Sequence, residues 1–187
     1  MMLENSGEAD STAAVAVYIV RHAHAQPRDS WAGSDKQRPL TDRGAKEAQA
    51  IVDHFGTGPP GGALSHDLGA AQPEPRPTLL VSSSAERCLA TLRPLAAACG
   101  LPVGTAEFLA EGSDACSALV QLKDLAAGGG VPVLCTHGDV IWGILELLEK
   151  AGVHLSGPLD VKKGSIWVLE TVSGSVESAR YIPPDKV

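Results

Sequence analysis

The stretch Val-Ala-Val-Tyr-Ile-Val-Arg-His-Ala-His, residues 15–24, decides the fold. Apolar residues run without a break from Ala13 to Val20, which is typical of a strand that is buried on both faces of a sheet. Arg21 and His22 follow at its carboxyl end, where ligands bind in open α/β sheets. Arginine supplies a fixed fork for phosphate oxygens, and histidine supplies a nucleophile or base that titrates near neutrality. The pair therefore predicts a site at the end of the first strand.

Two later stretches repeat this pattern. Residues 78–82 form a second short apolar strand, and they run into residues 82–99, which are expected to form a helix with Arg87 in its first turns. Helix N-termini bind anions through their free N–H groups. Residues 131–136 are another apolar run, followed by His137. Because a doubly wound topology places such strand ends side by side, the sequence predicts one anion site built from Arg21, His22, Arg87 and His137.

The rest of the chain alternates helical and extended patterns. Thr41 is the expected N-cap of a helix whose apolar residues reach Phe55. Further helices are expected over residues 114–127 and 140–151, a short strand over 102–107, and a closing hairpin over 163–171 and 176–182 with its turn at 173–174. The pattern predicts an α/β fold, a three-layer αβα sandwich around a mostly parallel, doubly wound sheet of about six strands.

Length and composition favour one domain. With 187 residues, 44% of them hydrophobic, the chain has material for one ordinary core, expected over residues 14–187 after a disordered tail over 1–13. Residues 57–77 are rich in Gly, Pro and Ala without periodicity, so a flexible loop without catalytic residues is expected there. The formal net charge is −7, which excludes a general basic field for nucleic acid or an anionic membrane. An anionic substrate must then be held by a local cluster of cations.

The cysteines and the N-terminus indicate a cytoplasmic protein. Four cysteines are scattered without Cys-x-x-Cys spacing, so reduced, mostly buried thiols are expected and a zinc site is not. The first ten residues are acidic where a secretory signal is basic, and the apolar run after them is too short to span a bilayer. The sequence leaves the oligomeric state open.

The motifs at the three strand ends resemble those of the histidine phosphatase superfamily, also called phosphoglycerate mutase-like. The Arg21-His22 pair, the Ser-Ser-x-x-x-Arg stretch that ends at Arg87 and the Thr-His-Gly run at His137 occur in the family's order. The resemblance covers residues 15–182. Arg-Pro-Leu-Thr-x-x-Gly, residues 38–44, is similar to the short branch with SixA-type phosphohistidine phosphatases. A closer likeness, at residues 135–141 and 163–169, is to the phosphatase domain fused to actinobacterial Nudix hydrolases.

This resemblance implies a fold and a role for each site residue. His22 would be the nucleophile that becomes phosphohistidine, and Glu111 stands where the family often places its proton donor. The residues that would bind the phosphoryl group are Arg21, Arg87 and His137, with Arg38 and Gly138 as further phosphate contacts. No metal or other cofactor is implied. Two positions depart from the family pattern, Ala23 in place of glycine and Ser84 in place of a frequent proline, and neither removes a chemical group.

Several alternatives stay open at this point. Phosphomonoester or phosphohistidine hydrolysis is preferred over mutase chemistry because the chain has no obvious ordered insertion to form a cap. A non-catalytic phosphate-binding domain is a second alternative. The presence of all the proposed catalytic groups, including His22, argues against it. His22 and His24 also lie on one face of an extended segment, where both imidazoles could bind one zinc ion, as in a metallohydrolase. The predicted site residues contact only the phosphoryl group and therefore do not identify the substrate. It could be a small phosphorylated metabolite, a nucleotide or a phosphoprotein.

Overall fold

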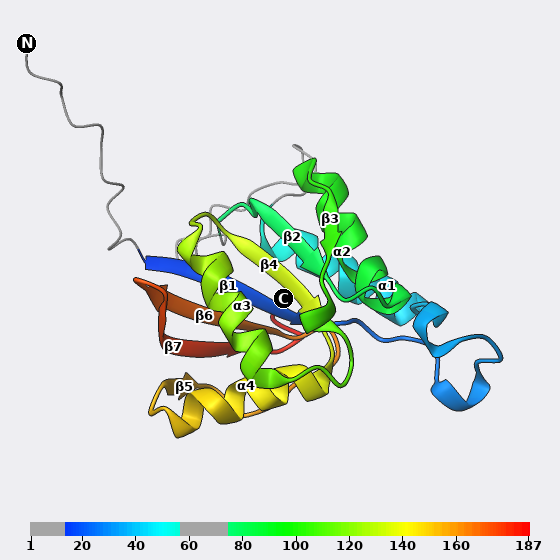
Figure 1. The fold of residues 1–187 in the computed structure, drawn as a ribbon. Coiled ribbons are helices and arrows are strands. Elements are labelled where there is room, and N and C mark those ends of the chain that lie inside the picture. The colour runs from blue at the N-terminus through cyan, green and yellow to red at the C-terminus, as the bar shows by residue number, and fades with distance from the viewer. Residues whose placement is uncertain (1–13, 57–74) are drawn as a thin grey trace, which may run out of the picture.

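The computed structural model describes residues 14–56 and 75–187, which form one sheet with helices on both faces (Figure 1). The strands are β1 (Ala14–Arg21), β2 (Leu79–Ser82), β3 (Val103–Thr105), β4 (Pro132–Thr136), β5 (His154–Ser156), β6 (Ile166–Val172) and β7 (Ser175–Ile182). The helices are α1 (Asp42–His54), α2 (Glu86–Cys99), α3 (Ala115–Ala127) and α4 (Gly138–Lys150). Three short 3-10 turns add η1 (Arg28–Ser30), η2 (Asp35–Gln37) and η3 (Glu107–Leu109).

The sheet has the order β3-β2-β4-β1-β6-β7-β5. Strands β3, β2, β4 and β1 are parallel neighbours, and only the pairs of β6 with β1 and with β7 are antiparallel. The expected α/β fold with a mostly parallel sheet is thus confirmed. The described residues give seven strands, one more than expected, because the three-residue β5 pairs in parallel with β7 at the sheet edge. Three residues are too few to show an alternating pattern in the sequence.

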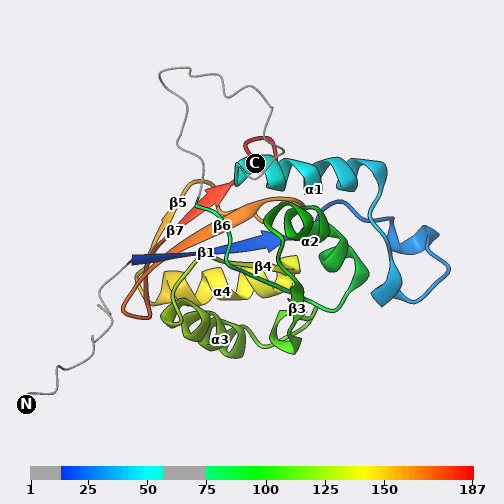
Figure 2. The same cartoon turned by 90° about the horizontal axis from the view of Figure 1, so that it is seen from above.

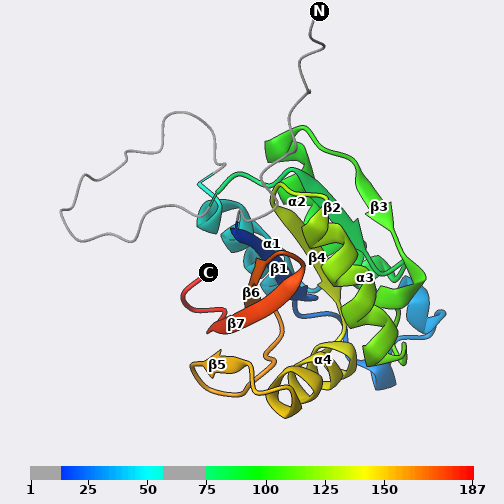
Figure 3. The same cartoon turned by 60° about the vertical axis from the view of Figure 1, so that its left-hand side comes forward.

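The sheet lies between two helical layers, with α1 and α2 on one face and α3 and α4 on the other (Figures 2 and 3). Strand β1 lies in the middle of the sheet and contributes side chains to the cores on both faces. Tyr18 and Val20 pack in the core that includes α1 and α2, while Val17 and Ile19 pack in the core that includes α3 and α4. Since successive side chains of a strand point to opposite faces, a strand covered on both faces must be apolar throughout. The unbroken apolar run of the sequence has this physical cause.

Helix α1 begins as the sequence predicts. The Oγ1 of Thr41 accepts a hydrogen bond from the backbone N–H of Gly44 at 3.2 Å, which satisfies one of the free donors of the first turn. Gly44 packs directly against the chain after β1, since a Cβ atom at this position would lie 2.0 Å from the backbone oxygen of His24. The glycine of the Pro-Leu-Thr-x-x-Gly motif is therefore required for this close approach.

Helix α2 differs from the prediction at its start. It begins at Glu86, with Ala85 as N-cap, and not at Ser82. Ser82 is the last residue of β2, and the backbone N–H of Ser83 donates to the Cys135 carbonyl of β4 at 2.9 Å. This sheet hydrogen bond holds the chain extended at Ser83. The predicted end of the helix at Cys99 is confirmed, and Gly100 caps it in the left-handed conformation.

The remaining expectations have mixed outcomes. The closing hairpin is confirmed, and its turn residues Ser173 and Gly174 both have positive φ, as a tight hairpin requires. The four cysteines are free, but only Cys88 and Cys135 are buried, fewer than expected. The predicted tail over 1–13 and most of the predicted loop over 57–77 lie outside the described residues. No helix in the described ranges is long and apolar enough to cross a membrane.

Candidate active site

The carboxyl ends of the central strands bring four predicted site residues together. Arg21 ends β1 and His22 follows it, Arg87 lies in the first turn of α2 near the end of β2, and His137 joins β4 to α4. The His22 and His137 rings meet edge to face, with centroids 5.4 Å apart. Figure 2 shows β1 pointing toward the loop of residues 22–41 that lies over this end of the sheet. Parallel neighbouring strands thus deliver these side chains to one place.

His22 is held as a neutral imidazole in one tautomer. Its Nδ1 lies 2.9 Å from the carbonyl oxygen of Ala23, which can only accept, so Nδ1 carries the proton and Nε2 keeps a free lone pair. Burial lowers the pKa of His22 to about 3, and the nearby positive charges of Arg87 and Arg21 act in the same direction. The Ala23 backbone is itself fixed, since its N–H donates to Thr91 Oγ1 at 2.9 Å. This arrangement leaves Nε2 of His22 with a lone pair that is free to act as a nucleophile or as a base.

His137 is oriented from both sides of its ring. The Nη2 of Arg87, which can only donate, lies 3.3 Å from Nδ1 of His137, so Nδ1 accepts and the ring proton is on Nε2. Nε2 then donates to the Ser83 hydroxyl at 2.9 Å and lies 3.5 Å from Cys88 Sγ. Ser83 was not predicted as a site residue, although the serine run before Arg87 was a signal for it. The serine run thus brings the Ser83 hydroxyl within hydrogen-bond distance of His137.

Arg87 is buried at the site and donates hydrogen bonds to several of the residues around it. Its side chain is 2% exposed, and Nη1 donates to the backbone oxygen of Asp35 at 2.9 Å and to its carboxylate at 3.1 Å. Nη2 donates to the Glu111 carboxylate at 2.7 Å. Carboxylate oxygens therefore occupy the fork of this buried guanidinium. Phosphate oxygens are bound by the same geometry.

Two further buried donors lie at the site. Among residues 14–56 and 75–187, the Nε–H groups of Arg21 and Arg87 are buried and have no hydrogen-bond partner, while Nη1 of Arg21 donates to the Val161 carbonyl. A Cβ atom at Gly138 would lie 3.0 Å from the guanidinium carbon of Arg21, so this glycine makes room for Arg21 at the start of α4. Buried donors are almost always satisfied. An anion bound here could satisfy them.

A carboxylate that the sequence analysis did not single out joins three arginines. Asp35 accepts from Arg38 Nε at 2.9 Å and from Arg28 Nε at 2.9 Å, in addition to its bonds with Arg87. Burial opposes the charge of Asp35, but the hydrogen bonds from Arg38 and Arg28 outweigh it, and the pKa of this carboxyl is lowered. Asp35 stands in a polar loop without periodicity, where no sequence signal separates it from Asp29.

The other predicted contacts take different positions. Arg38 is buried, but it binds the loop itself through Asp35 and through the Gln26 carbonyl at 2.7 Å. Glu111 is half-exposed at the mouth of the site and is bound by Arg87 and by Arg28. The next residue, Gly112, has a positive φ, and its N–H donates to Asp139 at 2.7 Å, which fixes the turn that presents Glu111.

His24 makes its own contacts away from His22. Its Nδ1 bonds with the Thr41 hydroxyl at 2.8 Å, and its backbone N–H donates to Glu47 at 2.7 Å. In the described part of the chain, no three or more His, Cys, Asp or Glu side chains are grouped as a metal site would need. The two imidazoles of the His-x-His pattern therefore serve separate hydrogen bonds.

Residues 17–113, about half of the chain, match the family model of the histidine phosphatase superfamily (branch 1). The chain belongs to this superfamily. The matched range contains Arg21, His22, Arg87 and Glu111, and the family resemblance stated from the sequence is confirmed.

Relatives of known structure or name support this assignment. An 8-oxo-(d)GTP phosphatase from Mycolicibacterium smegmatis is 33% identical over 175 residues, which cover 91% of this chain and 49% of that protein. The chain thus spans about half the length of this relative. The protein histidine phosphatase SixA complexed with tungstate has a TM-score of 0.65 at 18% identity, covering 90% of this chain and 95% of that one. A phosphoglycerate mutase from Bacillus anthracis str. Sterne has a TM-score of 0.59 at 14% identity, covering 90% and 93%.

These structural neighbours share the fold of this chain. The relative from M. smegmatis is named a phosphatase, in agreement with the name of the superfamily.

Proposed function

We propose that this histidine phosphatase hydrolyses a phosphomonoester or phosphohistidine through a covalent phosphohistidine on His22. The observation that carries the proposal is the contact between Nδ1 of buried His22 and the Ala23 carbonyl. Its Nδ1 is committed to the Ala23 carbonyl, and its lowered pKa leaves Nε2 unprotonated at neutral pH, beside Arg87 and His137. A neutral imidazole with one fixed nitrogen and one free nitrogen is the form that can attack phosphorus.

The reaction has two steps. Nε2 of His22 attacks phosphorus in line, the bond from phosphorus to the leaving oxygen breaks, and that oxygen takes a proton from Glu111. A water molecule then gives a proton to Glu111 and attacks the phosphohistidine, the bond from phosphorus to Nε2 breaks, and inorganic phosphate, neutral His22 and protonated Glu111 result. The guanidinium groups of Arg21 and Arg87 and the His137 imidazole stabilise the charge on the equatorial phosphoryl oxygens in both steps.

Binding of substrate exchanges one set of anions for another. The phosphoryl oxygens compete with Asp35 and Glu111 for the Arg87 guanidinium, which both carboxylates occupy in the free protein. Once Arg87 releases it, Glu111 takes up a proton and becomes the carboxylic acid that the leaving oxygen requires. The guanidinium groups perform the charge neutralisation that a divalent ion performs in metal-dependent phosphatases.

Nucleotides are the first substrate class to test. The relative from M. smegmatis is named for a nucleotide, and it is similar to this chain over nearly the chain's whole length. Phosphohistidine proteins are the second class, because SixA is named a protein histidine phosphatase. Small phosphorylated metabolites form the third.

The deciding experiment traps the intermediate. Wild-type protein is mixed with a phosphorylated substrate in the presence of a chelator and quenched, and we expect an acid-labile, base-stable phosphoenzyme with the label on His22. His22→Asn should lose both the label and turnover, while His154→Asn, on an exposed strand, should keep both. Substantial turnover by His22→Asn would exclude the mechanism, and a phosphorylated enzyme that donates to a second alcohol instead of water would indicate a mutase.

A further inference from the structure

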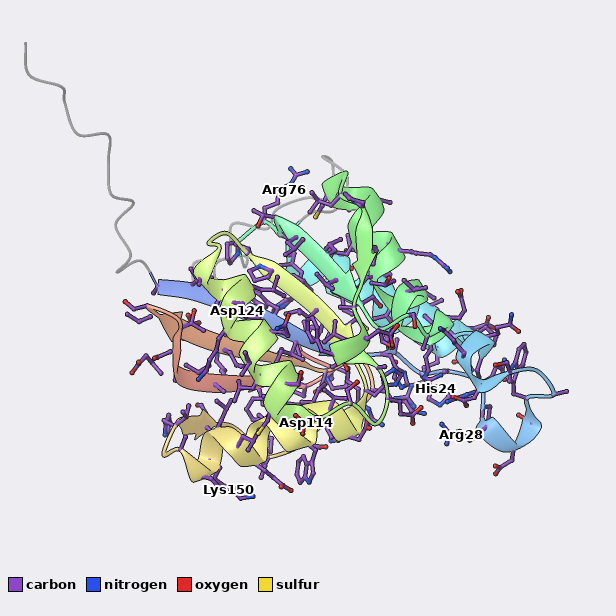
Figure 4. The ribbon with its side chains drawn as sticks, in the orientation of Figure 1. His24, Arg28, Arg76, Asp114, Asp124 and Lys150 are labelled. Atoms are coloured by element: carbon purple, nitrogen blue, oxygen red, sulfur yellow. The ribbon has the colours of Figure 1, made fainter. Side chains whose placement is uncertain are left out.

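We infer that Arg28 forms a second anion subsite, which binds a second phosphoryl group of the substrate next to the one held by Arg87. This inference rests on the proposed phosphatase function and adds a substrate class, phosphate esters that carry two linked phosphoryl groups. Arg28 lies on the loop after β1, on the same side of the molecule as His24 (Figure 4).

The first observation is that Arg28 and Arg87 share the same two carboxylates. Nη2 of Arg28 lies 3.2 Å from both Glu111 oxygens, and its Nε and Nη2 bind the two Asp35 oxygens at 2.9 and 3.3 Å. Arg87 binds the same Asp35 and Glu111 groups from the inside, at 3.1 and 2.7 Å. Each of these two carboxylates thus bridges the buried guanidinium of Arg87 and the exposed guanidinium of Arg28.

The second observation is that the Asp35 and Glu111 carboxylates occupy the positions at Arg87 that the phosphoryl oxygens of a ligand would take. A phosphoryl group that enters the Arg87 fork must displace carboxylate oxygens that also bind Arg28. Arg28 then loses partners at the moment when the substrate arrives, and a phosphoryl group linked to the first one reaches the space that a carboxylate had bridged. Arginine binds such oxygens through two parallel N–H bonds.

The third observation is that Arg28 can change partners at low cost. Its side chain is 62% exposed, and solvent screens exposed ion pairs so that they contribute little to stability. Arg38, in contrast, is buried and fixed to the Gln26 carbonyl as well as to Asp35. Arg28 is therefore suited to a ligand, and Arg38 to holding the loop.

The test compares ligands with one and two phosphoryl groups. Orthophosphate and pyrophosphate are titrated calorimetrically in the presence of a chelator, and nitrophenyl phosphate, a nucleoside monophosphate and a nucleoside diphosphate are compared as substrates. Arg28→Gln removes the outer guanidinium. The matched control is Arg93→Gln, because Arg93 is also exposed and ion-paired, with Glu86 on α2.

We expect wild-type protein to bind pyrophosphate more tightly than orthophosphate, and Arg28→Gln to lose about ten- to a hundredfold of pyrophosphate affinity, the scale of a charge-assisted bidentate bond. Activity of Arg28→Gln on the nucleoside diphosphate should fall by the same factor, while orthophosphate binding and nitrophenyl phosphate turnover change less than about threefold. The Arg93→Gln variant should behave as wild type.

Equal losses for all ligands, no loss, or equal wild-type affinities for orthophosphate and pyrophosphate would each overturn the inference. The calorimetric preference does not depend on turnover. A protein that hydrolyses none of the esters but shows the Arg28-dependent pyrophosphate preference would refute the proposed function and still support the subsite.

Discussion

The imidazole of His22 stays neutral at physiological pH because burial lowers its pKa from 6.5 to about 3. Between these two values the unfolded chain binds a proton at this position and the folded chain does not. This protonation difference favours the unfolded chain as the solution becomes more acidic. The burial that keeps this imidazole neutral therefore makes the fold sensitive to acid.

We predict that His22→Asn weakens the acid dependence of stability. In the wild-type protein, His22 should lower the free energy of unfolding by up to about 1.4 kcal/mol for each pH unit below about 6.5. Urea unfolding near neutral pH and near pH 5 would show a smaller decrease in His22→Asn than in wild type or in His154→Asn, where the histidine is exposed. The same decrease in all three proteins would mean that His22 titrates normally in the folded state.

Glu111 offers a second prediction at this scale, concerning proton donation. An alkoxide leaving group needs a proton as its bond to phosphorus breaks, whereas nitrophenolate is a stable anion. Glu111→Gln should therefore slow hydrolysis of alkyl phosphates by about a hundredfold and nitrophenyl phosphate much less. Steady-state kinetics on both substrates check this, with Glu107→Gln in the neighbouring η3 turn as control. If both substrates slowed equally, Glu111 would be a substrate contact or a structural residue.

At the scale of elements, the start of α1 is joined to the chain that follows β1. The Thr41 hydroxyl contacts Nδ1 of His24 at 2.8 Å and donates to the His24 carbonyl at 3.2 Å, while it also caps the helix at Gly44. The segment directly after His22 is thus fixed by a helix that begins about twenty residues later in the sequence. The packing requires that no side chain stand at position 44.

We predict that Gly44→Ala destabilises the fold by about 1–3 kcal/mol, the usual cost of overpacking. The added methyl group would lie 2.0 Å from the backbone oxygen of His24, so helix or loop must shift. Urea unfolding measures the loss. Gly104→Ala is the matched control, because the nearest atom to its added Cβ is 3.7 Å away and little change is expected. Equal stability of the Gly44→Ala and wild-type proteins would show that the approach of α1 to His24 relaxes freely.

For the whole molecule, the main feature is an acidic chain with a local group of cations. The net charge is −7, yet Arg21, Arg28, Arg38 and Arg87 gather at one end of the sheet. Asp35 joins three of them and connects the loop of residues 22–41 to α2 in the body of the protein. The Asp35 carboxylate therefore competes with any bound phosphate for the same guanidinium groups.

We predict that Asp35→Asn strengthens orthophosphate binding by about three- to tenfold, because the competing carboxylate charge is removed. Calorimetric titration measures the change. Asp29→Asn, in the η1 turn of the same loop, alters the net charge equally and should have little effect. Unchanged or weaker binding in Asp35→Asn would mean that Asp35 holds the arginines in place for the ligand and does not compete with it.

The sequence by itself determined the features that depend on short-range patterns. The apolar run before Arg21, the cap at Thr41, the hairpin turn at Ser173 and Gly174, and the strand ends at His22 and His137 were all predicted. Each follows from side-chain alternation, capping or turn chemistry within a few residues. The parallel order of the strands then brings the predicted residues to one edge of the sheet.

Only the tertiary structure decided which groups meet across long distances in the chain. The loop that carries Asp35 and Arg28 has no periodicity, so nothing in the sequence indicates that Asp35 lies against Arg87, fifty-two positions away. The start of α2 at Glu86 was also set by the neighbouring strand, whose Cys135 carbonyl holds Ser83 extended against the local pattern. Ion pairs and sheet ladders of this kind form only when distant segments fold together, and local sequence patterns do not encode them.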